Sequence, residues 1–271
     1  MPELAELKFT ADYVNEVSEG MSYVGVQKNP VHKGEALNIP FKKFRIKAES
    51  KGKEMVLYFL DRYSDQFIPV RITMGMSGHF KVTNTGQEPK HAHLKFHRND
   101  GTTMSFVDVR RFGKWKQGLT WSENRGPDPT RDYDAFWKHV MTNLTKLKKP
   151  LYEALMDQKY FNGIGNYLRA EIIFRAGDVD PFLPAGEQIA KYPKILELCR
   201  DIPLLAYAKG GGSIRDWDNP FGADSIQEKF MLCYGNAEMS KRKDRNGRTF
   251  WYEPKWDVPT SRDDLKDYLY G

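Results

Sequence analysis

Apolar and polar residues alternate with a period of two through most of the chain up to residue 118. The apolar members of these runs are Phe44, Ile46 and Ala48, then Met55, Leu57 and Phe59, then Val70, Ile72 and Met74, then Ala92, Leu94 and Phe96, and finally Met104 and Phe106. Such alternation places successive side chains on opposite faces of a strand. With turn residues between the runs, it predicts an antiparallel β-sandwich or barrel.

A helix is predicted in front of this strand-rich region, over residues 11–19. Tyr13, Val14 and Val17 give it one apolar face, and Thr10 is a suitable N-cap residue. The first domain is therefore expected to combine an N-terminal helix with the sheet.

The period changes to that of a helix in the second half. Apolar residues recur at helical spacing between residues 136 and 147, and further helices are predicted over 151–159, 167–176 and 187–208. Residues 209–224 are rich in glycine and have no regular period. Asn-Gly at 246–247 lies between polar and aromatic flanks, which is a strong hairpin signal.

These patterns predict an α+β protein of two domains. The expected divisions are an N-terminal sandwich domain (1–120), a linker (121–131), a helical domain (132–232), a hairpin (233–256) and a tail without an assigned role (257–271).

Composition narrows the class of partner. The chain has 42 Lys and Arg against 36 Asp and Glu, a formal charge of +6, which favours nucleic acid over a membrane. No apolar run reaches transmembrane length, and charged residues interrupt the N-terminal segment, so neither a span nor a signal peptide is expected. Two cysteines are too few for a disulfide framework or a four-cysteine zinc site. We expect an intracellular protein without a metal or another cofactor.

Three basic clusters occupy residues 41–54, 110–116 and 241–248. A single cluster of this kind is most often a solvated face. Three of them, two interleaved with aromatic residues, favour binding to a phosphate backbone.

Pro2 is a candidate nucleophile. If Met1 is removed, Pro2 carries a free secondary amine, and an α-amino group titrates near ~8. Such an amine attacks carbonyl carbons as Schiff-base lysines do. Glu3 places a carboxyl group beside it. Many proteins begin with Met-Pro by chance, so this pair is weak evidence alone.

Other candidates have a structural and a functional interpretation. Lys53, at the start of a strand, is either a surface lysine or a cation held over a phosphate or sugar. Met76 lies in a turn, where it either folds back on the core or inserts into a base stack. Arg110 and Phe112 allow the same two interpretations. The glycine turn at residues 161–166 is either a simple helix connection or an anion site.

In order along the chain, these segments resemble the Fpg/Nei family of DNA glycosylases, from Pro2 to about Tyr252. The resemblance is closest to the vertebrate Nei-like members whose finger lacks zinc. The matching segments are Pro2-Glu3 with Glu6, residues 51–54, 75–78, 91–94, 106–113, 153–158, 161–171, 233–235 and 244–249.

The resemblance implies a β-sandwich joined to a helix–two-turns–helix domain, with damaged DNA between them and the damaged nucleotide flipped out. It also implies that Pro2 attacks C1′ of that nucleotide and forms an iminium. Glu3 is the implied general acid at the sugar ring oxygen, and Lys53 assists near the lesion. Elimination at the β and then the δ position cuts the strand.

The resemblance assigns further residues to DNA. Met76, Arg110 and Phe112 match residues that fill the gap left by the flipped base. The implied positions for other DNA contacts are His91, Asn166, Tyr167 and Tyr234. Arg248, just after the Asn-Gly turn, matches the arginine that most members present on a zinc finger, so the hairpin here is expected to be a zincless finger.

The chain departs from the family pattern in three places. Leu4-Ala5 replaces the common Gly-Pro after the reacting groups. Tyr152 stands where many members have a lysine, so Lys149 is a candidate for that phosphate contact. The loop at 209–224 does not align securely, and its candidates for base contact are Arg215, Trp217 and Phe221.

We therefore expect a monomeric, bifunctional glycosylase and AP lyase, nuclear if eukaryotic and otherwise cytoplasmic. The expected substrates are oxidised pyrimidines, formamidopyrimidines and hydantoins rather than 8-oxoguanine. The alternative is a non-catalytic relative that binds damaged DNA or junctions.

Overall fold

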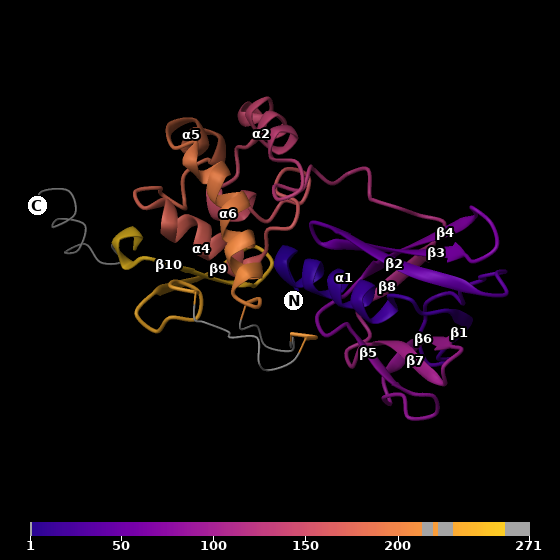
Figure 1. Cartoon of the computed structure of the whole chain (residues 1–271). Helices are drawn as coiled ribbons and strands as arrows, with labels where there is room; N and C mark the ends of the chain where they lie inside the picture. Colours follow the sequence, from indigo (N-terminus) through magenta and orange to yellow (C-terminus); the bar gives the residue numbers. More distant parts are fainter. Residues whose placement is uncertain (1, 213–218, 222–229, 258–271) are drawn as a thin grey trace, which may run out of the picture.

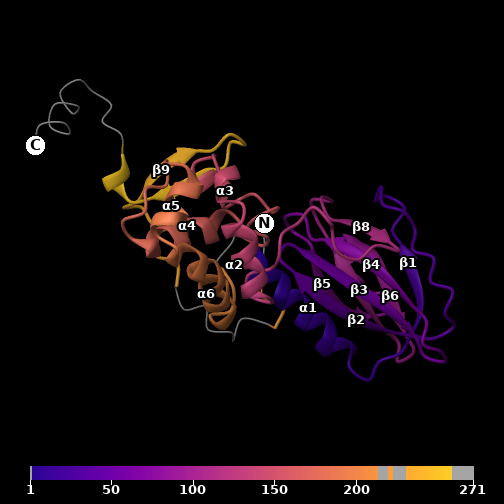
Figure 2. The ribbon, with the colours of Figure 1, turned by 90° about the horizontal axis from the view of Figure 1, so that it is seen from above.

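The computed structural model describes residues 2–212, 219–221 and 230–257. A sheet-rich part and a helical part lie side by side, and the first helix, α1 (Leu4–Ser18), runs between them (Figures 1 and 2). None of the helices in the described ranges combines the length and the apolar character that a membrane span requires.

The sheet has the order β5-β7-β6-β1-β2-β3-β4-β8, and neighbouring strands are antiparallel. Its strands are β1 (Tyr23–Lys28), β2 (Phe44–Lys51), β3 (Glu54–Asp61), β4 (Phe67–Thr73), β5 (His79–Asn84), β6 (Ala92–Arg98), β7 (Thr102–Val107) and β8 (Lys114–Gln117).

The sheet folds on itself into a sandwich. Only one register pair, Tyr23 with Phe44, joins β1 to β2. This narrow connection divides the sheet into two halves, β5-β7-β6-β1 and β2-β3-β4-β8. The rings of Phe59 on β3 and Phe96 on β6 lie 5.7 Å apart, which shows that the halves pack face to face. The alternating apolar residues are buried between them, so the predicted sandwich is confirmed.

Helix α1 begins seven residues earlier than the predicted helix. Its start is set by Glu6, whose Oε2 accepts a hydrogen bond of 2.8 Å from the backbone N–H of Glu3. Thr10, the predicted cap, lies inside the helix, and its hydroxyl donates to the Glu6 carbonyl. Leu4 joins the helical core and Leu7 joins the sheet core, so α1 connects the two cores.

The second part contains α2 (Tyr133–Met141), η1 (Leu144–Lys146), α3 (Leu151–Ala154), α4 (Asn166–Ala176), α5 (Ala185–Lys191) and α6 (Lys194–Ala208). The helix predicted over 151–159 was too long, and the one predicted over 187–208 is interrupted. The first ends at Ala154, because the N–H groups of Met156 and Asp157 bond to the carbonyls three residues back and form turns instead of a further helical turn. The second consists of two helices, because Tyr192, which precedes Pro193, leaves the helical conformation (φ −130°, ψ 71°) and Pro193 is the N-cap residue of α6.

The predicted hairpin is present. It consists of β9 (Ser240–Lys243) and β10 (Thr249–Tyr252), paired from Thr249 with Lys243 to Tyr252 with Ser240. At its tip, Asp244 Oδ1 accepts hydrogen bonds from the backbone N–H groups of Asn246 and Arg248, both at 2.9 Å. A short 3₁₀ turn, η2 (Pro254–Trp256), follows.

Candidate active site and DNA interface

Glu3 lies buried at the junction of the two parts, where its carboxylate caps helix α4. Its Oε1 accepts a hydrogen bond of 3.0 Å from the Tyr167 N–H, and its Oε2 accepts one of 3.2 Å from the Leu168 N–H. Burial raises the pKa of the Glu3 carboxyl above its usual value, although Lys53 and these two donors oppose the increase. A carboxyl group that retains its proton more readily is suited to act as a general acid.

Lys53 reaches the same point from the turn between β2 and β3. Its Nζ donates a hydrogen bond of 3.0 Å to the Ile164 carbonyl. Burial lowers the pKa of the Lys53 ammonium; the charge of Glu3 opposes this decrease, and that of Arg248 adds to it. The chain start and the β2–β3 turn therefore each contribute a charged group to one small volume beside the first turn of α4.

Gly165 shows how closely these groups meet. A Cβ atom at this position would lie 2.2 Å from Glu3 Cδ and 2.4 Å from Lys53 Nζ. Its φ of −130° is accessible to any residue, so space is what requires a glycine here.

Replacing Gly165 with alanine is expected to displace the Glu3 carboxylate or the Lys53 ammonium. We expect a loss of about 1–3 kcal/mol in the free energy of unfolding, as in other overpacked sites, together with a loss of catalytic activity. Gly25→Ala is the matched control, since a Cβ there would meet only His97 at 3.9 Å. Denaturant unfolding and strand-cleavage assays test this, and equal behaviour of the two variants contradicts it.

Pro2 is buried next to Glu3. The chain start is anchored by the Leu4 N–H, which donates a hydrogen bond of 3.1 Å to the Gly163 carbonyl. Gly163 has a φ of +102°, and a Cβ there would lie 2.5 Å from Leu4. The departure at Leu4-Ala5 therefore adds apolar packing against the glycine turn, with both side chains buried.

Glu6 is a second buried carboxyl group, whose role sequence reasoning missed. Its Oε1 accepts hydrogen bonds from the Tyr167 hydroxyl at 2.9 Å and from the Gly212 N–H at 2.8 Å. Burial raises the pKa of this carboxyl too. The spacing of Glu3 and Glu6 is that of a capping box and was the available signal. Tyr167, with its ring buried, belongs to this network, and its DNA contact stays a prediction.

The hairpin is tied to α4 through Arg169, which the sequence analysis did not single out. This buried guanidinium lies 3.0 Å from Asp244 Oδ2 and donates to Asn166 Oδ1 at 2.5 Å. The Asn166 amide in turn donates to the Thr249 carbonyl at 3.0 Å. Tyr152, which replaces the family lysine, stacks on Phe250 with 4.9 Å between ring centroids. Side chains thus hold the hairpin in position.

The exposed Arg248 lines a cavity of about 420 Å³ at the hairpin, together with Lys149 and Arg245. Lys149 lies 3.4 Å from Asp157, and Arg245 lies 2.9 Å from Glu153. Among the described residues, no cluster of three or more His, Cys, Asp or Glu is placed to hold a metal ion. Both cysteines, Cys199 and Cys233, are buried free thiols.

Met76, Arg110 and Phe112 come from two turns that buried Asp108 joins. Its carboxylate accepts hydrogen bonds from the Ser77 hydroxyl, the Arg110 N–H and the Gly113 N–H, at 2.5, 3.2 and 2.7 Å. The Phe112 side chain is 53% exposed, which is unusual for a phenylalanine, and the Arg110 guanidinium lies 5.1 Å from its ring centre. The structure therefore presents these residues together on one edge of the sandwich.

The remaining predicted contacts lie on both sides of the junction. His91 is half-buried in the turn just before β6, and its carbonyl accepts from the Asp108 N–H. Tyr234 is half-buried, with its ring 6.3 Å from that of Tyr167. Phe221 contacts the rings of Phe9 and Tyr13 edge-on. The candidates Arg215 and Trp217 lie outside the described residues.

Comparisons with known proteins identify the class. A family model for the N-terminal domain of formamidopyrimidine-DNA glycosylase matches residues 1–115. The human and mouse proteins named endonuclease 8-like 1 are each 33% identical over 93% of this chain and 72% of their own length. The formamidopyrimidine-DNA glycosylase of Streptococcus pneumoniae is 32% identical over 68% of both chains.

Solved structures show the same fold. The MutM (Fpg) protein from Thermus thermophilus has a TM-score of 0.76 at 22% identity, covering 95% of this chain and all of that chain. A complex of LlFpg with DNA containing N7-benzyl-Fapy-dG has a TM-score of 0.77 at 20% identity, with the same coverage. The chain therefore belongs to the Fpg/Nei family of DNA glycosylases, which are DNA-repair enzymes with glycosylase and AP lyase activity.

Proposed function

We propose that the chain removes oxidised bases from DNA and cuts the strand at the resulting site, through a covalent intermediate on Pro2. The observation that carries this proposal is the meeting of Glu3 and Lys53 over Gly165, beside the N-terminal proline. An amine, a carboxyl group with a raised pKa and a half-buried ammonium are the groups that this reaction requires.

The Pro2 nitrogen attacks C1′ of the flipped nucleotide, the bond from C1′ to the base breaks, and the departing base takes up the proton that the Pro2 nitrogen loses. Glu3 donates a proton to the sugar ring oxygen, which opens the ring and leaves an iminium at C1′. The iminium acidifies C2′; loss of a C2′ proton expels the 3′ phosphate, and a second elimination expels the 5′ phosphate. The Lys53 ammonium, anchored on Ile164, stabilises negative charge that develops during these steps.

Damaged DNA is proposed to lie across the junction, with its phosphates against basic side chains of both parts. Arg248 and Lys149 line one cavity of the hairpin side, and Asn166 lies beside it at the start of α4. On the sandwich side, Met76, Arg110 and Phe112 are placed on neighbouring turns to fill the space of the flipped base. His91, Tyr167 and Tyr234 complete the proposed contacts.

The proposed substrates are oxidised pyrimidines, formamidopyrimidines and hydantoins. The likeness to the endonuclease 8-like 1 proteins and the finger held by side chains both support this choice. An enzyme of this kind works where the DNA is, in the nucleus of a eukaryote or in the cytoplasm of a bacterium.

A panel of lesions in duplex and single-stranded DNA, treated with borohydride, tests the function. We expect covalent trapping and strand cleavage with thymine glycol, a formamidopyrimidine, a hydantoin and an abasic site, and weaker reaction with 8-oxoguanine. Undamaged DNA of the same sequence is the control. Tight binding to the damaged strands without trapping on any of them would show a non-catalytic DNA-binding protein instead.

A further inference from the structure

Two side chains share the carbonyl group that holds the catalytic lysine. Ile164 O accepts hydrogen bonds from Lys53 Nζ at 3.0 Å and from Gln158 Nε2 at 2.9 Å. On its other side, Gln158 Oε1 accepts from the Gly163 N–H at 2.9 Å and from an Arg125 guanidinium N–H at 3.3 Å. The Gln158 amide therefore holds both the carbonyl that accepts from Lys53 and the N–H of Gly163, the residue before Ile164.

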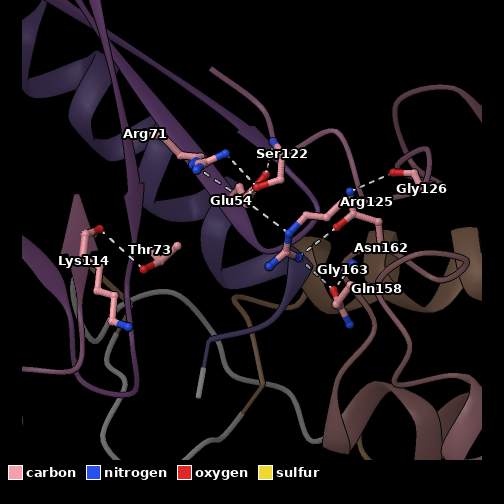
Figure 3. Close-up of polar contacts among 10 residues, drawn as sticks. All are labelled: Glu54, Arg71, Thr73, Lys114, Ser122, Arg125, Gly126, Gln158, Asn162 and Gly163. Atoms are coloured by element: carbon pink, nitrogen blue, oxygen red, sulfur yellow. Dashed lines mark hydrogen bonds and ion pairs between the residues drawn. The ribbon is translucent and has the colours of Figure 1, made fainter. Parts of the chain in front are cut away.

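Arg125 connects this turn to the sheet domain. Its Nε lies 3.4 Å from Oε1 of Glu54, which follows Lys53 directly in the chain, and its guanidinium also donates to Asn162 Oδ1 at 3.4 Å. Glu54 is buried and accepts hydrogen bonds from both the N–H and the hydroxyl of Ser122. Figure 3 shows Arg125 between Glu54 on one side and Gln158 with Asn162 on the other.

The segment around Arg125 is accordingly held in place at several points. Gly126 donates its N–H to the Gln158 carbonyl, and its own carbonyl accepts from the Asn162 amide at 3.0 Å. A Cβ at Gly126 would lie 2.6 Å from the Lys159 carbonyl oxygen. The connection between the domains is thus packed against the turn that carries the Lys53 acceptor.

Arg71 offers an internal comparison. It contacts the same carboxylate, at 3.8 Å from Glu54 Oε1, and its side chain is 24% exposed against 23% for Arg125. Its guanidinium donates to the Ser122 hydroxyl at 2.7 Å. In Figure 3, Arg71 lies on the far side of Glu54 from the glycine turn.

We propose that Arg125 and Gln158 are positioning residues that hold the Lys53 ammonium in its working place through the Ile164 carbonyl. Arg125 contacts both Glu54, the neighbour of Lys53 in the chain, and Gln158, which holds the Ile164 carbonyl. The backbone of Lys53 and the acceptor of its ammonium are therefore held relative to each other. In this proposal the reacting atoms are contacted by Pro2, Glu3 and Lys53, and Arg125 and Gln158 act only through Lys53. The inference rests on the proposed function, since its effect is expressed through Lys53.

The test compares Arg125→Gln with Arg71→Gln on DNA containing a preformed abasic site. Single-turnover cleavage by Arg125→Gln is expected to fall at least tenfold, while the Kd for the same DNA changes less than threefold. Arg71→Gln removes the other guanidinium of Glu54 and is expected to keep the cleavage rate within twofold of wild type. A general loss of folding would not separate rate from Kd in this way.

Gln158→Met is a second test variant. It leaves the contacts of Glu54 in place and removes the hydrogen bonds of the Gln158 amide to Ile164, Gly163 and Arg125. The same rate loss is expected, with the Kd again little changed. Rates are compared well below the melting temperature of each variant. A loss of cleavage rate in Arg71→Gln equal to that in Arg125→Gln would overturn the proposed role of Arg125. A wild-type cleavage rate in Gln158→Met would overturn the proposed role of Gln158. A wild-type chain that does not cleave abasic DNA would instead contradict the proposed function.

Discussion

The Pro2→Gly variant is expected to lose covalent trapping and abasic-site cleavage by at least about a hundredfold, because it replaces the secondary amine that forms the iminium. An iminium from proline has no N–H to lose and stays charged, which favours elimination at C2′. Glycine at the terminus offers a primary amine on a more flexible chain end. Borohydride trapping and single-turnover cleavage of abasic DNA measure the loss.

A protein with one added residue before Pro2 is the matched control. It keeps every side chain of the site but turns the amine into an amide, so trapping is expected to disappear while the melting temperature stays close to that of wild type. The anchoring bond from the Leu4 N–H to the Gly163 carbonyl is unaffected by this change. Undiminished trapping by the blocked protein would show that another amine is the nucleophile.

Glu3→Gln is expected to lower base excision by about 10²–10⁴-fold, the usual contribution of a positioned general acid. The amide has no proton of comparable acidity for the sugar ring oxygen, although it keeps a hydrogen-bonding oxygen at the start of α4. Cleavage of a preformed abasic site is expected to fall much less, since an abasic sugar already reaches its open aldehyde form without a proton from Glu3. Single-turnover assays on a hydantoin strand and on an abasic strand separate the two steps.

Glu16→Gln is the control for this variant, because it changes an exposed glutamate on the same helix. It is expected to leave both reactions unchanged. Equal losses of Glu3→Gln on the two strands would contradict a role specific to base excision and would make Glu3 a structural cap of α4.

The strands and the hairpin were predictable because their signals are local. Alternating residues such as Phe44, Ile46 and Ala48 face the core of a sheet whose other side is solvated. The turn at the hairpin tip is also local, since Gly247 has a φ of +74° and the Asp244 carboxylate accepts hydrogen bonds from the N–H groups of Asn246 and Arg248. The first turns of α1 were missed, since its start at Leu4 depends on the Glu3–Glu6 contact and on burial against both cores.

The chemical groups of the site were recognisable in the sequence, but their geometry was not. Glu3, Lys53 and Gly165 are far apart in the chain, and their meeting is a result of the packing of two domains. The sequence around Arg169 did not indicate its role, because its immediate neighbours in the helix are apolar. The structure shows the role through its contacts with Asp244 and Asn166. The connection of Arg125 to the Lys53 acceptor likewise depends on three-dimensional contacts.

The central claim is that the terminal amine of Pro2 forms the covalent bond to DNA. Its most direct test is to trap the protein on an abasic strand with borohydride, digest the complex and locate the sugar adduct by mass spectrometry. The account predicts an adduct on the N-terminal peptide that begins with Pro2, and none when an extra residue precedes it. An adduct on Lys53 or another lysine, with an unmodified Pro2, would contradict the account.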